Sequence, residues 1–128
     1  MEFIPHSPAE GIYPATADYI HAIEVVAPQR FLFVSGTMGL DPEGRPGAGI
    51  DSQLILIWNN IRTILASAGM STDNIVRLTS YLRSADYADA NAAARTAALG
   101  ERRIPTTAII AETLSPDWLV EIEVVAAA

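Results

Sequence analysis

The sequence predicts a single α+β domain over residues 1–128, with two helices packed on one face of a mixed β-sheet. Two segments have helical spacing or helix-forming composition, and β-rich runs alternate with them in the order ββ–α–β–α–ββ. Because only two helices connect the strands, both are expected on the same side of the sheet. The other face would then lack a cover, and we expect oligomerisation to bury it.

The amino-terminal third predicts strands and one long loop. A proline-rich lead-in carries a short edge strand at Glu2–Ile4. The β-rich runs Tyr19–Val26 and Arg30–Ser35 are separated only by Ala27–Gln29, which predicts a hairpin. Thr37–Gly49 contains four of the eight glycines and two prolines, and is therefore expected to be a loop.

Two segments predict helices. Asp51 is the expected N-cap of the first, and Gly69 is placed to end it. The second helix, Asp86–Leu99, follows Ser84 and is rich in alanine, which permits close approach to a sheet or to another helix. Apolar side chains of the first helix fall at helical spacing at Leu54, Ile57, Trp58, Ile61, Ile64 and Leu65.

Three further strands are expected at Asn74–Leu82, Thr106–Ala111 and Trp118–Ala127. The last of these is apolar apart from Glu121 and Glu123, which alternation places on one face. Two ionised carboxylates on one strand face are costly to bury. Either this face is solvated or paired with arginine from a neighbouring copy, or one carboxylate lies in a cleft and moves a proton.

Composition excludes several kinds of chemistry. The chain has 8 Lys+Arg against 15 Asp+Glu and a net charge of −7, which argues against nucleic acid and anionic membranes as partners. It has no cysteine, and all its cations are arginine, so thiolate, disulfide and Schiff-base lysine chemistry are absent. With two histidines, a multi-histidine metal site is not expected, and we predict neither metal nor cofactor.

The amino-terminal residues contain no basic segment followed by an apolar one, so no signal peptide is predicted. No apolar run has the length of a membrane span. A cytoplasmic location is therefore expected.

Three other places could carry chemistry. His21 lies two residues from Tyr19 on the same predicted strand face, and is either a hydrogen-bonded structural residue or a proton carrier. Ser35-Gly36 ends a strand with small groups, which makes either an ordinary turn or a backbone edge open to a ligand. Arg102 and Arg103 follow the second helix and either complement its carboxyl end or bind an anionic ligand.

Five segments in order resemble the RidA (YjgF) family of enamine/imine deaminases: VSGTMGLDPEG, WNNIRTILASAGMSTDNIVRLTSYL, ADYADANAA, RIPTTAIIAETL and LVEIEVVAAA. The resemblance extends from about Tyr19 to Ala127. It implies a chorismate-mutase-like fold and a homotrimer whose sheets form a barrel-like core with the helices outside. It also implies small-molecule clefts between neighbouring subunits and no cofactor.

The resemblance also implies roles for particular residues. Glu121 matches the glutamate that positions the hydrolytic water. Tyr19, Ser35, Gly36 and Asn91 match the tyrosine, the serine–glycine strand end and the helix asparagine that line the substrate pocket.

One position departs from the family pattern. Where the family reads Pro-x-Arg, this chain reads Pro105-Thr106-Thr107, so a threonine replaces the arginine that clamps the substrate carboxylate. Losing this clamp costs about 1.5–3 kcal/mol of binding, which disfavours short amino-acid imines as substrates. Thr107 and the backbone amides up to Ile109 could instead hold a neutral polar group, and Arg103 is a second candidate contact.

The expected function is therefore a RidA-like enzyme that hydrolyses, or transfers a proton on, a reactive imine, enamine or related carbonyl compound. Glu121 and His21 are its candidate catalytic residues, His21 standing where the deaminases carry a neutral side chain. The alternative is a non-catalytic small-molecule-binding or regulatory trimer. A ribonuclease, an activity attached to some relatives, is disfavoured by the negative charge.

Overall fold

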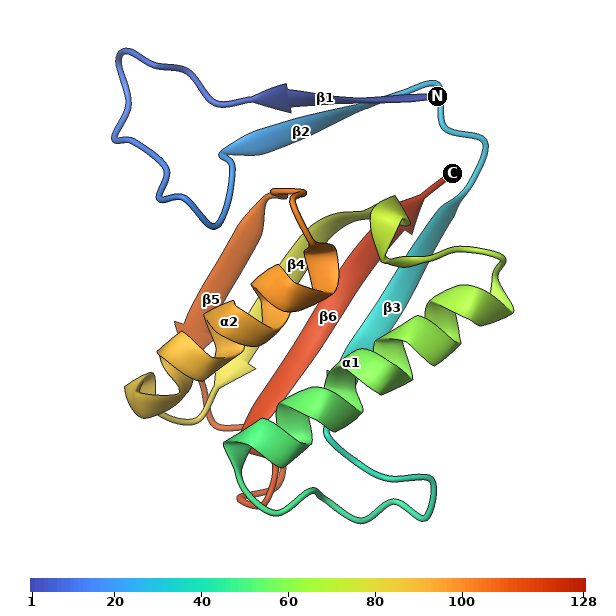
Figure 1. Ribbon diagram of the computed structural model, residues 1–128, viewed down its shortest axis with the longest axis vertical. Coiled ribbons are helices and arrows are strands. Elements are labelled where there is room, and N and C mark those ends of the chain that lie inside the picture. Colours follow the sequence, from blue (N-terminus) through green and yellow to red (C-terminus); the bar gives the residue numbers. More distant parts are fainter.

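Two helices lie on one face of a four-stranded mixed sheet in the computed structural model, which describes residues 1–128 (Figure 1). The helices are α1 (Ile50–Ser67) and α2 (Ala88–Leu99), and the sheet order is β3-β6-β4-β5. A separate two-stranded sheet pairs β1 (Glu2–His6) with β2 (Ala22–Val26). The predicted α+β class, with both helices on one side, is confirmed. The sheet strands are β3 (Phe31–Met38), β4 (Ile75–Leu82), β5 (Thr106–Ile110) and β6 (Val120–Ala127).

The strand β6 occupies the middle of the sheet. It pairs antiparallel with β3 on one side and with β4 on the other. β4 and β5 are parallel, and α2 provides the crossover between them. The burial of β6 alternates strictly at first, so Val120 and Ile122 face the helices while Glu121 and Glu123 face away. The predicted alternation in this strand is confirmed.

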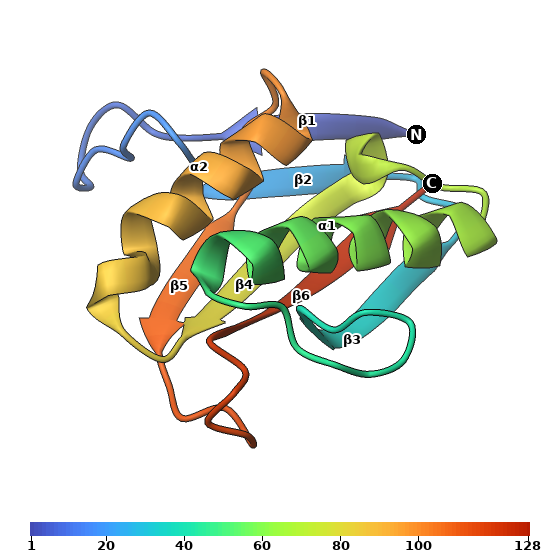
Figure 2. The ribbon, with the colours of Figure 1, turned by 60° about the horizontal axis from the view of Figure 1, so that its bottom comes forward.

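The predicted hairpin between Tyr19–Val26 and Arg30–Ser35 is wrong. β2 pairs with β1, and β3 pairs with β6. After β2 the chain bends at Ala27, which has a φ of 51°, and the next two backbone amides donate to the carbonyl of Ala128. At this bend the chain leaves the small sheet and enters β3 of the large one. The small sheet lies beyond the end of the large sheet where β5 begins and β6 ends (Figures 1 and 2).

The helix boundaries follow local chemistry. α1 begins after Gly49, which has a φ of 86° and provides no side-chain cap, so the prediction that Asp51 is the N-cap is wrong. Asp51 lies in the first turn, where its negative charge interacts favourably with the positive end of the helix dipole. Gly69, with a φ of 68°, ends the helix as expected. Ser84 accepts from the amide of Asp86 and caps a short 3-10 turn, η2 (Ala85–Tyr87), that leads into α2. A second such turn, η1 (Thr72–Asn74), precedes β4.

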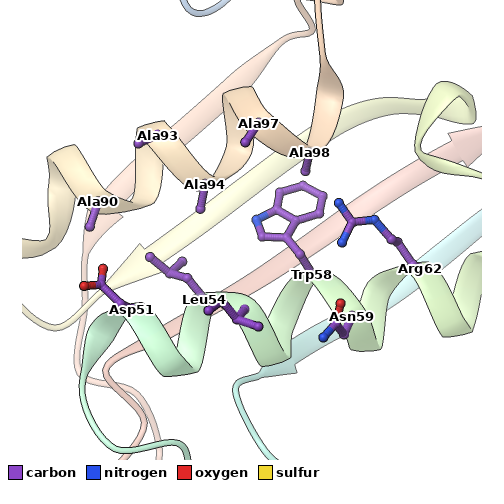
Figure 3. Close-up of a pocket in the computed structure, with 11 residues that line it drawn as sticks. Asp51, Leu54, Trp58, Asn59, Arg62, Ala90, Ala93, Ala94, Ala97 and Ala98 are labelled. Carbon is purple, nitrogen blue, oxygen red and sulfur yellow. The ribbon is translucent and has the colours of Figure 1, made fainter.

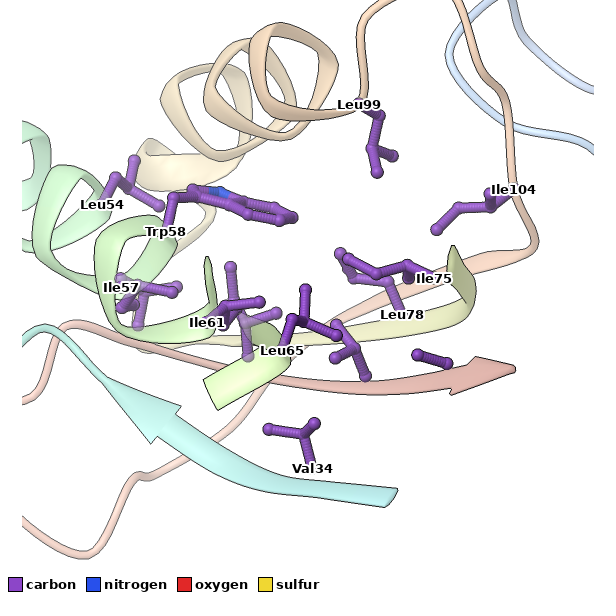
Figure 4. Close-up of a cluster of buried hydrophobic side chains, with 14 of the residues drawn as sticks. Val34, Leu54, Ile57, Trp58, Ile61, Leu65, Ile75, Leu78, Leu99 and Ile104 are labelled. Carbon is purple, nitrogen blue, oxygen red and sulfur yellow. The ribbon is translucent and has the colours of Figure 1, made fainter. Parts of the chain in front are cut away.

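The core lies between α1 and the sheet (Figure 4). Ile57, Ile61 and Leu65 point from α1 toward the sheet and are fully buried, as are Leu78 of β4 and Ile122 of β6. Truncation of such a side chain to alanine typically costs about 2–5 kcal/mol. The expected apolar stripe of the first helix is therefore confirmed, except that Ile64 lies at its edge and is 37% exposed.

The amino-terminal segment is tied to α2 and to the loop after it. The carboxylate of Asp18 pairs with Arg95, whose side chain is buried, and Arg103 donates to the carbonyl of Ala17. A hydrogen bond from the Thr16 hydroxyl, with smaller contributions that include the charge of Arg95, lowers the pKa of Asp18. These contacts position the segment that carries Tyr19 and His21.

The second face of the sheet has no helix over it. Phe31 and Phe33 of β3 and Ile109 of β5 are exposed there, Phe33 by 76%. A face of this kind suits a subunit contact, so the homotrimer remains a prediction. Neither helix combines the length and apolar character that crossing a membrane requires.

Candidate functional site

The helix-free face of the sheet, called here the open face, carries ordered rows of side chains. The strand registers place Tyr81 of β4 between Glu121 of β6 and Ile109 of β5 in one row. Met38 of β3 pairs with Glu121 on its other side and completes the row. Two residues further along the strands, Thr79 lies between Glu123 and Thr107. In the next row Arg77 is beside Val125, which pairs with Phe33. The open face is thus acidic at one end and carries a cation at the other.

Glu121 lies directly over Gly36 of the neighbouring strand. A Cβ built on Gly36 would be 2.3 Å from Oε2 of Glu121 and 2.8 Å from its Cδ, so only glycine leaves room for this carboxylate. Glu121 and Tyr81 line a hollow of about 320 Å³ together with the loop 111–114. The sequence left open whether Ser35-Gly36 makes an ordinary turn or a backbone edge open to a ligand; in the structure the group that lies against Gly36 is the side chain of Glu121.

Glu123 differs from Glu121 in its hydrogen bonding. The Tyr81 hydroxyl donates to Oε1 of Glu123 over 2.5 Å. This hydrogen bond is the main reason why the pKa of Tyr81 is raised, because the carboxylate stabilises the protonated phenol. No side chain or backbone amide donates to Glu121, so its carboxylate is free for a ligand or a water molecule. The two glutamates therefore have different environments although they share a face.

Ser35 and Gly36 lie at an irregularity of β3, where the register with β6 shifts between Val34 and Thr37. The Thr37 hydroxyl donates to the carbonyl of Ser35 and stabilises this bend. Ser35 is exposed and borders a hollow of about 550 Å³ that also reaches Asn60 of α1. The predicted strand end is therefore a bulge inside a longer strand, since β3 continues to Met38 through the start of the predicted loop.

His21 joins the amino-terminal segment to the sheet. Its Nε2 lies 2.9 Å from the carbonyl of Tyr13, and because a carbonyl only accepts, this nitrogen carries the proton. The rings of Tyr13 and Tyr19 meet the imidazole edge-on at 5.0 and 5.9 Å. His21 also lines a hollow of about 360 Å³ with Arg77. Tyr19 and His21 precede β2, so the prediction that they lie within a strand Tyr19–Val26 is wrong.

His21 and Glu121 are far apart within one chain. His21 lines the same hollow as Val125, which is four positions along β6 from Glu121. With a rise of about 3.3 Å per strand residue, Val125 and Glu121 are about 13 Å apart. The structure therefore does not bring the two predicted catalytic residues together in one copy of the chain.

Two predicted contacts lie away from the open face. Asn91 is buried on the helix side of the sheet, where its Oδ1 accepts from the Ser80 hydroxyl. Arg103 donates to the carbonyls of Ala17, Gly100 and Arg102 in the loop after α2. Both side chains hold structure together in this geometry, and neither lines the hollow at Glu121.

Sequence reasoning missed Arg77. Its Nη2 donates to Oγ1 of Thr107 over 3.4 Å, so an arginine from β4 lies beside the threonine of β5. Alternation in IVRLTSYL could have identified it, because Arg77, Thr79 and Tyr81 form a polar face opposite Val76, Leu78 and Ser80. Arg102, the other arginine considered, donates to the carbonyls of Thr72 and Ile75, and burial lowers its pKa.

A second groove lies between the helices (Figure 3). It has a volume of about 420 Å³ and is lined by Leu54, Ile55 and Trp58 of α1 and by alanines of α2. It holds none of the predicted site residues. No group of three or more His, Asp or Glu side chains in the chain is placed to hold a metal ion.

Two helices over one face of a mixed sheet, with carboxylates and a cation on the other face, define a class of small α+β protein whose sheet face is open to ligands or subunits. Residues 12–128 match the family described as Endoribonuclease L-PSP. A RutC family protein of Pyrococcus abyssi is 34% identical over 111 residues, 84% of each chain. A RutC family protein of Aquifex aeolicus is 42% identical over 65 residues, half of each chain.

Solved structures agree. A Rid-family protein of unknown function from Yersinia pestis superposes with a TM-score of 0.85 at 25% identity and covers both chains fully. RidA from an Antarctic Psychrobacter has a TM-score of 0.74 at 25% identity, covering 95% of this chain and 94% of its own. The chain belongs to the RidA (YjgF) family.

Proposed function

We propose that the protein is a small-molecule enzyme that hydrolyses a reactive imine or enamine, or a related carbonyl compound, on its open face. The observation that carries the proposal is the carboxylate of Glu121, which lacks a hydrogen-bond donor, lies over Gly36 and borders a hollow of about 320 Å³. A free carboxylate beside a ligand-sized hollow is suited to accept a proton from water. Membership in the Rid family supports this assignment.

The proposed reaction needs only water and one proton carrier. Glu121 accepts a proton from water as the oxygen adds to the carbon of the C=N bond, and passes this proton to the nitrogen, which gives a carbinolamine. Glu121 then takes the proton of the carbinolamine hydroxyl and delivers it to the nitrogen. The C–N bond breaks, the carbonyl forms and ammonia leaves, so the carboxylate is restored. Tyr81 holds Glu123 in a hydrogen bond and leaves Glu121 as the carboxylate that acts.

A homotrimer in the cytoplasm with clefts between copies is part of the proposal. The exposed aromatic side chains of Phe31 and Phe33 provide apolar surface for such a contact. The distance between His21 and Glu121 in one chain also favours a shared site, because a neighbouring copy could present its own Tyr19 and His21 there.

The substrate is proposed to differ from short amino-acid imines. Thr107 is uncharged and too short to form the paired hydrogen bonds that an arginine makes with a carboxylate. The name of the matched family includes a ribonuclease, but a net charge of −7 disfavours binding of a phosphate backbone.

Imine turnover tests the proposal. An amino-acid oxidase forms a panel of imines in situ, from small and acidic to bulky and apolar. The assay measures the rate at which each imine releases its keto acid. Native protein should accelerate release from some of them, Glu121→Gln should lose at least 100-fold, and Glu101→Gln, a distant exposed control, should match the native rate. Binding without turnover across the panel would overturn the enzyme assignment in favour of a binding protein. Thr107→Arg should gain activity on the small acidic imines.

A further inference from the structure

We propose that Arg77 and Thr107 form an anion-binding subsite on the open face, which selects substrates whose carboxylate or phosphate group is distant from the reacting carbon. This inference rests on the proposed function for its link to catalysis. The proposal that the subsite binds an anion depends only on Arg77 and Thr107.

Arg77 is a cation without an anionic partner. Its side chain is exposed, and the ion pairs of the chain involve His6, Arg45 and Arg95 instead. In a chain of net charge −7, an arginine that pairs with none of fifteen acidic residues leaves its charge available to a ligand. Arg102 and Arg103 have no such freedom, because neighbouring carbonyls occupy their guanidinium groups.

Thr107 orients this cation. Its Oγ1 accepts from Nη2 of Arg77, which uses one of the five guanidinium N–H groups and restrains the others. The hydroxyl proton of Thr107 stays free to donate. Two donor groups from neighbouring strands thus converge on one point, and a planar or tetrahedral oxyanion can accept from both.

Space for the rest of a ligand exists on either side of Arg77. One hollow of about 360 Å³ is lined by Arg77 with His21, Pro105 and Val125. Another of about 220 Å³ is lined by Arg77 with Phe33 and Glu123. The cation forms part of the wall of both hollows. The first has five apolar residues in its wall and suits the apolar body of a ligand whose anionic group is bound at Arg77, whereas the wall of the second also includes the carboxylate of Glu123.

The distance to Glu121 determines the kind of substrate. Thr107 and Glu121 differ by one row along the strands and by two strand spacings across the sheet. These steps place the two residues about 12 Å apart. In an α-imino acid the carboxylate is one bond from the imine carbon, which is too short to reach both groups. A chain of several bonds between the anion and the imine carbon fits the spacing.

Calorimetric titration tests the subsite without any turnover. Glutarate and inorganic phosphate are the probes, and their comparison distinguishes a carboxylate site from a phosphate site. At low salt the native protein should bind at least one of them about tenfold or more tightly than Arg77→Leu, with Arg77→Lys in between. Thr107→Val should weaken binding less than Arg77→Leu. Arg62→Leu removes an exposed arginine of α1 and should bind as the native chain does. Equal binding by native protein and Arg77→Leu, or no binding by the native protein, overturns the proposal.

Steady-state kinetics, together with the mass of the protein in solution, test whether the subsite contributes to the reaction. Imines formed by a flavin amine oxidase from ω-amino acids are compared with those formed from the corresponding methyl esters. Arg77→Leu should raise KM about tenfold for the acids and leave KM for the esters and kcat unchanged. Light scattering must give the same mass for both proteins, since a smaller mass for Arg77→Leu would assign Arg77 to an ion pair between subunits and overturn the proposal. If no imine is turned over while anion binding still depends on Arg77, the proposed function fails and the subsite remains.

Discussion

Replacing Gly36 by alanine should move the proposed catalytic carboxylate without changing the fold. The added Cβ would be 2.3 Å from Oε2 of Glu121, whereas ordinary contact begins near 3.4 Å, so the carboxylate must move by about 1.1 Å. Gly36 does not have a positive φ, so its backbone accepts alanine. A misplacement of this size costs about 100-fold in rate when geometry controls the reaction.

Stability gives a second measurement that does not depend on activity. Rotating the Glu121 side chain out of its preferred conformation costs about 0.5–1.5 kcal/mol, and glycine-to-alanine at a compatible site stabilises by about 0.4–1 kcal/mol. In the native background these effects oppose each other, and the free energy of unfolding should fall or stay level. In Glu121→Ala the atoms nearest to the new Cβ are gone, and the same substitution should stabilise.

Urea unfolding of the native chain, both single variants and the double variant measures this coupling, which we expect to be about 1 kcal/mol. Imine turnover by Gly36→Ala measures the catalytic effect. Glu101→Gln is again the control, because Glu101 is exposed and lies outside the proposed site. Equal stability changes in the two backgrounds, together with full activity of Gly36→Ala, would refute the close packing of Glu121 on this strand.

Three further outcomes are expected. The pKa of Asp18 is lowered from 3.8, so its carboxylate stabilises the fold above about pH 4 and this contribution is lost as the pH falls through the lowered value. Asp18→Asn should therefore unfold more easily at neutral pH and show a flatter decline in acid, as chemical denaturation across pH would measure. Glu123→Gln should bring the raised pKa of Tyr81 back toward 10.0, which ultraviolet titration of the phenol detects; an unchanged titration would contradict the hydrogen bond. Gln53 is 2% exposed and forms hydrogen bonds with three backbone groups in two loops. Gln53→Leu should therefore lower the free energy of unfolding in urea by about 3 kcal/mol. A loss below about 1 kcal/mol would contradict this role.

The helices and the two-faced last strand were predictable because their signals are periodic and local. Ile57, Ile61 and Leu65 identify the buried side of α1, and alternation alone places Glu121 and Glu123 together. The hairpin prediction failed because a turn at Ala27–Gln29 does not specify which strand comes alongside. The backbone groups that follow it bond to Ala128, about a hundred residues later in the sequence.

The candidate site was only partly predictable for a similar reason. Glu121, Gly36 and Thr107 were identified, and all lie on the open face. Arg77 was missed because nothing in its own strand distinguishes it from a surface arginine. Its contact with Thr107 depends on the pairing of two strands that are distant in the sequence. Which face a side chain occupies follows from alternation, but which neighbour it meets follows from strand pairing across the whole chain.

The central position of β6 has a consequence for synthesis of the protein. β3 has no strand partner in the large sheet other than β6, and β4 has only β5 without it. During translation, Phe31–Met38 must therefore wait for about eighty further residues before its edge is paired. The nascent chain exposes an unpaired strand with two aromatic side chains for that whole interval. Folding of the sheet is thus completed from its middle, and variants that slow the docking of β6 should aggregate during expression even where the finished protein is stable.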